Sequence, residues 1–315
     1  MKLLILSRDV RYYSTRRLVE AARQLNHPVS VVDPLECILS IDRNRPSLHL
    51  GKTKLKGFAV VLPRIGNIAI EYSLAVVKHF ELSGIRVVNN SKAIYLAKDK
   101  FISLQVLKSK GLPVPETIML RKGDALKKVV KELGGLPVVL KLLRGSQGVG
   151  VTLAKRMNQL VSLVKSTWKL DHDIIIQRYI PESRGADIRI LVVGGAVIAA
   201  MRRYPRRGDF RSNIHQGGYA EAIALPRLYE RLAQQAAQII GLEIAGVDII
   251  ESKRGPLIIE VNASPGFEGL EKVMASTIPY GTGQDIAQRI IKYATKTTPV
   301  PMDIGTPTKN SLKVY

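Results

Sequence analysis

The chain has 315 residues, 46% of them hydrophobic, which is typical of a globular protein with two or three domains. No apolar run is long enough to cross a membrane and Cys37 is the single cysteine, so a disulfide framework and a cysteine metal cluster are excluded and a cytoplasmic protein is expected. Lysine and arginine number 48 against 26 acidic residues, and the net charge of +22 favours an anionic partner: nucleic acid, a nucleotide or an acidic protein.

Residues 1 to about 90 alternate between short apolar runs and amphipathic stretches. The predicted strands are 2–6, 29–33, 58–62 and one beginning at Val87, and the predicted helices are 15–25, with Ser14 as its N-cap, and 68–83. This alternation predicts a parallel sheet flanked by helices. No Gly-x-Gly-x-x-Gly follows the first strand, so the dinucleotide-binding fingerprint is absent.

From Ser91 the pattern changes. Ser91 is predicted to cap a helix that carries Asp99 and Lys100, and residues 111–115 end this helical stretch. The later predicted elements are a helix over 124–133, strands over 137–142 and 151–154, short strands from 174 onward, and helices over 226–240 and 282–294. Residues 295–315 are rich in Thr, Pro and Lys and are predicted to form a flexible tail.

A glycine-rich segment, residues 144–150, separates the predicted strands 137–142 and 151–154. Glycines let backbone N–H groups approach phosphate oxygens, so the segment fits a flap over a triphosphate, and a purely structural hairpin is the alternative. It is not a Walker A loop, because no Gly-Lys-Ser/Thr follows. Lys141 lies in the apolar strand before it, where it faces either solvent or a bound anion.

The strand over 174–180 is a candidate sheet edge whose backbone groups pair with an adenine. Asp187 and Arg189 then share one strand face; Asp187 suits a ribose hydroxyl, and an internal Asp–Arg pair is an equal alternative. Residues 202–213 place five arginines in a predicted turn-rich loop. Guanidinium groups bind phosphate and carboxylate bidentately, so this loop is predicted to act as a lid.

Residues 246–262 predict a β-hairpin, because two β-branched runs flank a polar turn near Arg254. Antiparallel pairing around that turn sets Asp248 directly across from Glu260, and Asn262 shares the face of Glu260. Two carboxylates and an amide oxygen suit Mg²⁺, whose coordination water and substrate phosphates would complete. Pairing of these acids with some of the many arginines is the alternative.

This ordered series resembles the ATP-grasp carboxylate–amine ligases. The match is closest to the RimK type, which adds glutamate to the C-terminus of the sixth protein of the small ribosomal subunit. Four segments carry the resemblance, which covers nearly everything except the tail: 5–9, 63–66, 208–213 and 260–266. The last segment is common to many ATP-grasp enzymes, whereas the lid and the N-terminal segments are more specific to this branch.

The resemblance implies an α/β fold in which an N-terminal parallel α/β (pre-ATP-grasp) domain precedes an ATP-grasp fold. The expected parts are the N-terminal domain over 1–90, an ATP-grasp N-subdomain with the flap over 91–180, a C-subdomain with lid and metal site over 181–294, and the basic tail over 295–315.

The resemblance also assigns roles to residues. Residues expected to contact ATP are Lys100, Lys141, the flap residues Gly145, Ser146, Gln147 and Gly148, the adenine edge Gln177, Arg178 and Tyr179, and Asp187 at the ribose. Arg211, Ser212 and Asn213 are expected near the phosphates and the acyl intermediate, with Arg211 and Lys141 as catalytic residues. Asp248, Glu260 and Asn262 are expected to hold two Mg²⁺ or Mn²⁺ ions.

One departure concerns the adenine edge. Such ligases commonly carry Gln-Glu-Tyr there, whereas this chain has Arg178 in the middle position, so a side-chain acceptor for the adenine amine is missing.

The implied reaction converts an acceptor carboxylate into an acyl phosphate and joins it to the amine of L-glutamate. The expected acceptor is the acidic C-terminus of a ribosomal protein, with no membrane partner, nucleic acid contacted only through the ribosome, and a homotetramer. The same chemistry on a coenzyme, an amino-acid carrier protein or free glutamate is one alternative. A non-catalytic basic ribosome- or RNA-binding protein is another, although with 5% aromatic residues the charge fits a solvated basic surface equally well.

Overall fold

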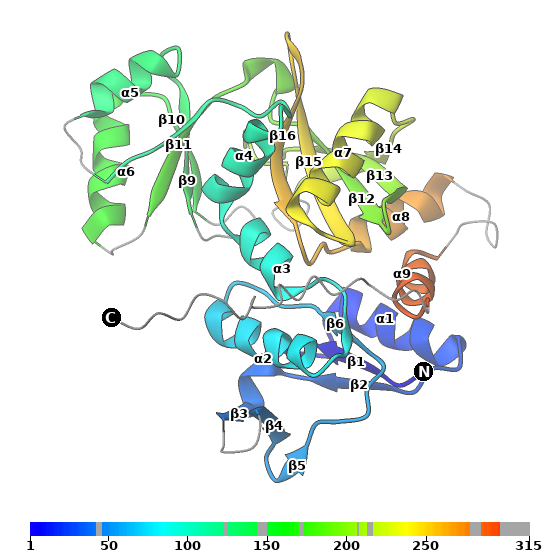
Figure 1. Cartoon of the computed structure of the whole chain (residues 1–315). Coiled ribbons are helices and arrows are strands. Elements are labelled where there is room, and N and C mark those ends of the chain that lie inside the picture. The colour runs from blue at the N-terminus through cyan, green and yellow to red at the C-terminus, as the bar shows by residue number, and fades with distance from the viewer. Residues whose placement is uncertain are drawn as a thin grey trace, which may run out of the picture.

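The computed structural model describes residues 1–41, 46–121, 125–143, 150–169, 173–206, 208–212, 217–277 and 285–296. Three parts follow one another along the chain (Figure 1): an N-terminal α/β domain, a small antiparallel sheet with two helices, and a larger antiparallel sheet with three helices. The predicted mixed α/β architecture is therefore confirmed. Among the described residues, no helix is both long and apolar enough to cross a bilayer.

The N-terminal sheet is parallel, as its alternating sequence predicts. Its strands are β1 (Leu3–Leu6), β2 (Val29–Val32), β6 (Val60–Pro63) and β7 (Arg86–Val87), in the order β2-β1-β6-β7, and its helices are α1 (Tyr13–Gln24) and α2 (Ile70–Leu82). Every residue of β1 is buried, as expected for a strand covered on both faces. The carboxyl ends of β1 and β6 therefore meet at one edge of the sheet.

A second, small sheet in this domain was not predicted. It contains β3 (Cys37–Ile41), β4 (Pro46–Leu50) and β5 (Thr53–Lys54), which pair antiparallel after a short 3₁₀ turn, Pro34–Glu36. Only Leu48 and Ser47 of β4 and Cys37 of β3 are well buried, so the segment lacks the continuous apolar pattern that marks the parallel strands.

Two predicted helix starts are wrong. The first helix begins without a side-chain cap after Tyr12, and the Ser14 hydroxyl instead accepts a hydrogen bond from the backbone N–H of Phe267 at 3.4 Å. Asn90, rather than Ser91, caps the next helix through a bond from the backbone N–H of Ala93 at 2.9 Å.

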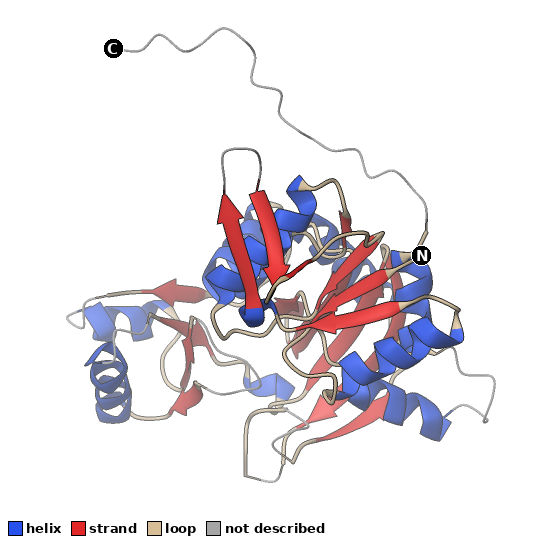
Figure 2. Ribbon diagram, turned by 90° about the horizontal axis from the view of Figure 1, so that it is seen from below, coloured by secondary structure: helices blue, strands red, loops and turns tan. Residues whose placement is uncertain are grey.

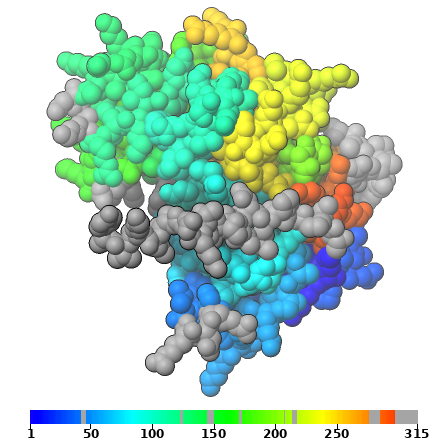
Figure 3. Space-filling model, in the orientation of Figure 1, coloured from blue at the N-terminus to red at the C-terminus, as the bar shows by residue number. Residues whose placement is uncertain are grey.

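That next helix is also interrupted at Asp99. Asp99 takes an extended conformation and caps a separate helix, so the predicted single helix is divided into α3 (Ser91–Lys98) and α4 (Lys100–Ser109). An internal Asp competes for backbone N–H groups and favours such a break. The break places Lys98 and Lys100 on either side of one turn. Figure 1 shows α3 next to the N-terminal domain and α4 beside the larger sheet, where it packs against α7 and β16. The space-filling view shows the cyan chain of this region between the N-terminal domain and the rest (Figure 3).

The second part of the chain is a four-stranded antiparallel sheet, which borders the predicted flap segment on both sides. Its strands are β8 (Thr117–Met119), β9 (Val138–Leu142), β10 (Val151–Ala154) and β11 (Ile174–Arg178), in the order β10-β9-β11-β8, and its helices are α5 (Leu126–Glu132) and α6 (Met157–Lys169). Val138 and Leu140 pack with the two helices, so the alternation of the strand turns Lys141 to the opposite face. Figure 2 shows this part standing apart from the larger sheet.

One face of the larger sheet packs against a helix, whereas the other is covered by helices only at one end. Its strands are β12 (Asp187–Val193), β13 (Ala196–Tyr204), β14 (Tyr219–Ala222), β15 (Ile244–Ser252) and β16 (Gly255–Asn262), in the order β14-β13-β12-β15-β16, and its helices are α7 (Arg227–Ile240), α8 (Glu268–Thr277) and α9 (Ile286–Ala294). Ile188 and Ile190 pack with α7 on one face, whereas Leu191 and Val193 pack with α8 and α9 on the other. The far end of that second face carries charged side chains.

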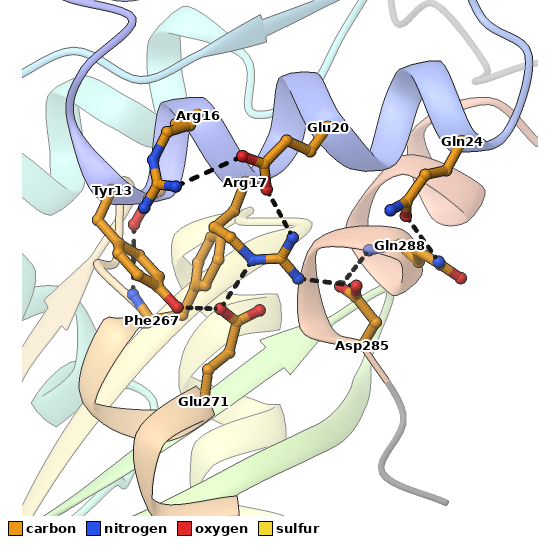
Figure 4. Close-up of polar contacts among 10 residues, drawn as sticks. Tyr13, Arg16, Arg17, Glu20, Gln24, Phe267, Glu271, Asp285 and Gln288 are labelled. Carbon is orange, nitrogen blue, oxygen red and sulfur yellow. Dashed lines mark hydrogen bonds and ion pairs between the residues drawn. The ribbon is translucent and has the colours of Figure 1, made fainter. Parts of the chain in front are cut away.

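Arg17 of α1 joins the N-terminal domain to the last two helices (Figure 4). Its guanidinium donates to Glu271 of α8 at 3.2 Å, to Asp285 at the start of α9 at 2.7 Å, and to Glu20 at 2.9 Å. Tyr13 donates to Glu271 at 2.6 Å, and burial, followed by this hydrogen bond, raises the pKa of Tyr13 to about 12. These contacts hold the chain that leaves β16 against the N-terminal domain.

Candidate active site

A row of charged side chains crosses the uncovered end of the larger sheet. Strand alternation puts Asp187 and Arg189 on one face of β12, and the register sets Arg189 opposite Asp248 of β15. Asp248 in turn lies opposite Glu260 of β16, so the predicted hairpin pairing is confirmed, with a β-bulge immediately after Asp248. Asn262 lies two residues beyond Glu260 on the same strand.

The carboxylates of Asp187 and Asp248 are bound by two arginines. Arg189 donates to both oxygens of Asp248 at 2.6 Å, and Arg203 of β13 donates to both oxygens of Asp187 at 2.6 Å. Arg203 also reaches Asp248 at 2.9 Å, and the Ser212 hydroxyl donates to Asp187 at 2.7 Å. Burial raises the pKa of Asp248, but the two arginines outweigh it and lower the pKa to about 2. The sequence left open that these acids pair with arginines instead of a ligand, and the structure shows such pairs. The partner of Asp187 is Arg203, however, and not Arg189.

Two lysines face Glu260 from other elements. Burial lowers the pKa of Lys141 in β9 and of Lys98 in α3 to about 8, and in each case the Glu260 carboxylate opposes the shift while Lys100 adds to it. The Lys98 ammonium donates to the carbonyl of Ile65 at 3.1 Å and to the Asn67 side chain at 3.0 Å. The lysines therefore meet a carboxylate without forming an ion pair with it.

Cations outnumber carboxylates at this place. Arg64, at the carboxyl end of β6, donates to the backbone carbonyl of Pro265 at 2.7 Å and lies close enough to Lys98 to lower its pKa. The cationic cluster comprises Arg64, Lys98, Lys100, Lys141, Arg189 and Arg203; the carboxylates beside it are Asp187, Asp248 and Glu260. An excess of positive charge that is partly removed from water favours a polyanionic ligand such as a triphosphate.

The oxygen ligands in this row fit a divalent cation. The Glu260 carboxylate makes no hydrogen bond or ion pair with any residue that the structure describes, so both its oxygens are available. Asn262 accepts the backbone N–H of Ser264 at 2.9 Å through its side-chain oxygen, which retains a second lone pair. Within the described ranges no three His, Cys, Asp or Glu side chains form a metal-binding group by themselves. The set therefore suits Mg²⁺ that keeps water and substrate phosphates as ligands.

The prediction of a sheet edge at Gln177 and Arg178 is wrong. β11 is an interior strand, paired with β9 on one side and β8 on the other, and the backbone N–H of Arg178 donates to the carbonyl of Glu116 at 2.9 Å. The side chains are also engaged, because Gln177 donates to Thr117 at 2.8 Å and Arg178 to Glu116 at 3.3 Å. Tyr179 lies beyond the end of β11, and its role at the adenine stays a prediction.

The prediction of five arginines in one loop is also wrong. Arg202 and Arg203 belong to β13, where they point to opposite faces, and Arg202 pairs with Glu251 at 2.6 Å. Arg211 lies in the described loop segment 208–212, where its guanidinium donates to Asp209 at 2.8 Å. This hydrogen bond lowers the pKa of Asp209 to about 2 against the opposing effect of burial.

The loop segment 208–212 is held against the start of β12. Gly185 has a φ of +80°, and a Cβ atom at this position would lie 2.6 Å from the carbonyl oxygen of Phe210, so no larger residue fits. Together with the bond from Ser212 to Asp187, this contact places Arg211 beside the charged row. Some predicted residues lie outside the described ranges: Gly145, Ser146, Gln147, Gly148, Arg207 and Asn213.

The residues that sequence reasoning missed are Arg64, Lys98, Arg189 as a partner of Asp248, and Arg203. Arg64 carried a signal, since it follows an apolar strand directly in the segment 63–66. Lys98 carried none, because a lysine next to Lys100 on a predicted helix reads as solvent-exposed.

The two lysine pKa values predict a pH dependence of nucleotide affinity. Lys141 loses its charge as the pH rises through about 8 in the folded protein, whereas an ordinary lysine keeps it to about 10.5. The affinity for a non-hydrolysable ATP analogue, measured by calorimetry, is therefore expected to fall from about pH 7 to about pH 9. The ligand-free protein is expected to gain stability over the same range, because the unfolded chain then binds more protons than the folded one. Lys141→Arg stays charged; an equally steep fall in this variant would contradict the assignment to Lys141.

Comparison with known proteins places these observations in one family. Residues 97–293 match the family model of the RimK-like ATP-grasp domain, and residues 1–94 match that of the RimK PreATP-grasp domain. A probable alpha-L-glutamate ligase of Marinomonas sp. (strain MWYL1) is 46% identical over 297 residues, which are 94% of this chain and 96% of that protein.

Solved structures share the fold. A RimK domain ATP-grasp protein of Sphaerobacter thermophilus has a TM-score of 0.72 at 22% identity, covering 94% of this chain and 100% of that one. The ATP-grasp ligase PsnB, in complex with a phosphomimetic variant of a minimal precursor, Mg and ADP, has a TM-score of 0.67 at 20% identity, covering 93% of this chain and 97% of that one.

Proposed function

Because this chain belongs to the RimK-like ATP-grasp family and is an ATP-dependent carboxylate–amine ligase, we propose that it adds L-glutamate to the acidic C-terminus of a ribosomal protein through an acyl phosphate. The observation that carries this proposal is the cationic cluster facing Glu260 between three parts of the chain. The name of the 46% identical relative supports glutamate as the amine substrate.

The nucleotide side of the proposed site lies on β9 and at the start of α4. Lys141 and Lys100 would neutralise the triphosphate, and Tyr179 would contact the adenine through its backbone. Two Mg²⁺ or Mn²⁺ ions would be held by Glu260, Asn262 and Asp248, and when bound they polarise the γ-phosphate. PsnB, which shares the fold, is known in complex with Mg and ADP.

The proposed reaction has two steps. An oxygen of the acceptor carboxylate attacks the γ-phosphorus and ADP leaves, which gives an acyl phosphate. The amine of glutamate then attacks the acyl carbon, phosphate leaves, and the amine loses a proton to solvent. Arg211, beside the charged row, would stabilise the oxyanion that develops at the acyl carbon. No side-chain nucleophile is required.

The net charge of +22 supports an acidic protein tail as the acceptor, since a basic enzyme attracts an acidic partner over a distance. A homotetramer and a cytoplasmic location complete the proposal. The same chemistry on a coenzyme, a carrier protein or free glutamate remains the alternative that the test must separate.

The test is an intact-mass screen of candidate acceptors after incubation with ATP, Mg²⁺ and glutamate. A mass increase of one or more glutamate residues on a ribosomal protein, dependent on ATP, would support the proposal. ADP release with glutamate alone, and products that grow without any acceptor protein, would instead identify polyglutamate synthesis. No ADP release with any acceptor would contradict a glutamate ligase altogether.

Arg206 and Arg207 provide a test of the acidic acceptor. They lie between β13 and the segment 208–212, and we expect their replacement by alanine to raise the KM of the acceptor and flatten its salt dependence while the KM of ATP changes little. Steady-state measurements at low and high salt decide this. A higher KM for ATP with an unchanged acceptor KM would assign both arginines to the nucleotide. Arg202→Ala, in the preceding strand β13 and paired with Glu251, is the matched control.

A further inference from the structure

The N-terminal sheet has a topological switch point next to the charged row. From β1 the chain continues to β2 on one side, whereas from β6 it continues to β7 on the other, so the connections diverge between β1 and β6. In open parallel sheets, ligands bind at the carboxyl ends of the strands at such a point. Here those ends carry residues 7–9 and Arg64.

The other polar groups at these carboxyl ends have partners within the domain. The Ser7 hydroxyl is hydrogen-bonded to Thr15 at 2.8 Å, Arg11 pairs with Asp9 at 2.6 Å, and Arg8 lies 4.0 Å from Asp33. They belong to the architecture of the strand ends and need no ligand.

Arg64 is different. Its guanidinium makes one hydrogen bond, to the Pro265 carbonyl at 2.7 Å, and no ion pair with any carboxylate that the structure describes. Burial lowers its pKa to about 10, and its charged neighbour is the ammonium of Lys98. A half-buried guanidinium beside a second cation is costly unless an anion binds it, because four of its five N–H donors lack an acceptor among the described residues.

The position of Arg64 selects among the anions of the proposed reaction. Lys100 and Lys141 approach from the parts that carry the nucleotide, whereas Arg64 comes from the N-terminal domain and meets the chain three residues after Asn262. When the reacting carboxylate of the acceptor is phosphorylated, its charge moves to the transferred phosphoryl group and the carbonyl itself becomes uncharged. The free amino acid keeps its carboxylates throughout, so it requires a permanent counter-charge, which the planar guanidinium supplies in bidentate form.

Resting on the function proposed above, we propose that Arg64 binds a carboxylate of the free amino-acid substrate at the carboxyl ends of β1 and β6. Arg64 thereby determines specificity for an acidic amino acid and positions its amine toward the acyl carbon near Asn262 and Glu260. The carboxylate is either the α-carboxylate or the side-chain carboxylate, and both share this chemistry.

The test compares wild type with Arg64→Lys and Arg64→Gln. Loss of a bidentate, charge-assisted contact is expected to raise the KM of glutamate roughly 10- to 100-fold while the KM values of ATP and of the acceptor stay within about twofold. Arg64→Lys retains a donor for the Pro265 carbonyl, and its thermal midpoint shows whether the fold is kept. Arg11→Lys, an exposed arginine on the same domain, is the matched control and should leave the glutamate KM unchanged.

Two amides of glutamate identify the carboxylate. L-Isoglutamine lacks the α-carboxylate, and L-glutamine lacks the side-chain carboxylate. Wild type is expected to use at least one of them with a kcat/KM at least about tenfold below that of glutamate. Arg64→Gln is expected to lose this discrimination for the analogue that lacks the carboxylate bound by Arg64. The role of Arg64, but not the proposed function, would be overturned by either of two results. One is unchanged discrimination and an unchanged glutamate KM in the variants, and the other is equal use of all three amino acids by wild type. Absence of glutamate-dependent turnover in wild type would overturn the proposed function as well.

Discussion

Glu260→Gln is expected to abolish ATP-dependent ligation while the protein stays folded. The Glu260 carboxylate makes no hydrogen bond or ion pair with the residues that the structure describes, so its replacement by an isosteric amide removes a charge without breaking a protein contact. The lost charge is the one that faces Lys98 and Lys141 and that would help to hold the metal ions. Turnover measured as ADP release at saturating Mg²⁺ should fall by several orders of magnitude, with an unchanged circular dichroism spectrum.

A second effect of this change separates electrostatics from metal binding. Glu260 raises the pKa of Lys141 against burial, so the variant is expected to lose lysine charge, and with it nucleotide affinity, at a lower pH than wild type. Glu251→Gln is the matched control, because Glu251 lies in the same hairpin but pairs with Arg202 on the opposite face. Activity of Glu260→Gln above about a tenth of wild type would rule out the assignment of Glu260 as a metal ligand.

Local patterns were sufficient to predict the elements whose partners are near in sequence. The β15–β16 hairpin is an example: strand alternation and a polar turn determine its register, and the register alone sets Asp248 opposite Glu260. The parallel N-terminal sheet followed from the alternation of apolar runs with amphipathic helices.

What failed depends on contacts between segments that are distant in sequence. β11 was predicted as an edge because nothing in residues 174–178 shows that β8, more than fifty residues earlier, pairs with it. The sequence suggested Arg189 or a ribose as the partner of Asp187, because Asp187 and Arg189 share one face of the same strand. The observed partner is Arg203, which lies directly opposite Asp187 on the adjacent strand β13. Lys98 comes close to Arg64 only because α3 packs on the N-terminal domain, where Lys98 donates to the carbonyl of Ile65. Arg64 reaches Pro265, two hundred residues later, only after that domain packs against the chain that leaves β16.

The arginine network also has a consequence for stability. Arg203→Met is expected to lower the free energy of unfolding by about 3–5 kcal/mol, because removal of one partner from a buried ion network leaves uncompensated carboxylates. Arg203 is 10% exposed, and its partners Asp187 and Asp248 are 7% and 4% exposed, so solvent does little to replace the lost charge. Asp248 would retain Arg189, whereas Asp187 would retain only the Ser212 hydroxyl among the residues that the structure describes.

Arg202→Met is the matched control for this prediction. Arg202 precedes Arg203 in β13 and points to the other face, where it pairs with Glu251 at 25% and 40% exposure, so its loss is expected to cost only about 0–1 kcal/mol. Urea unfolding of both variants gives the comparison. A cost for Arg203→Met no larger than that for Arg202→Met would show that the network contributes no more than a surface pair.

The pH dependence of the Arg203→Met effect tests its cause. In wild type the arginines hold the pKa of Asp248 at about 2, so its contribution is present above the unfolded value of 3.8 and is lost only as the pH falls through about 2. Without Arg203 the buried Asp248 carboxylate binds protons more readily, and the variant should regain stability relative to wild type as the pH falls toward about 4. Adding Asp187→Asn to Arg203→Met should restore part of the loss at neutral pH, since it removes the carboxylate left without a cation. A loss that is independent of pH and unaffected by Asp187→Asn would instead assign the effect of Arg203→Met to side-chain packing.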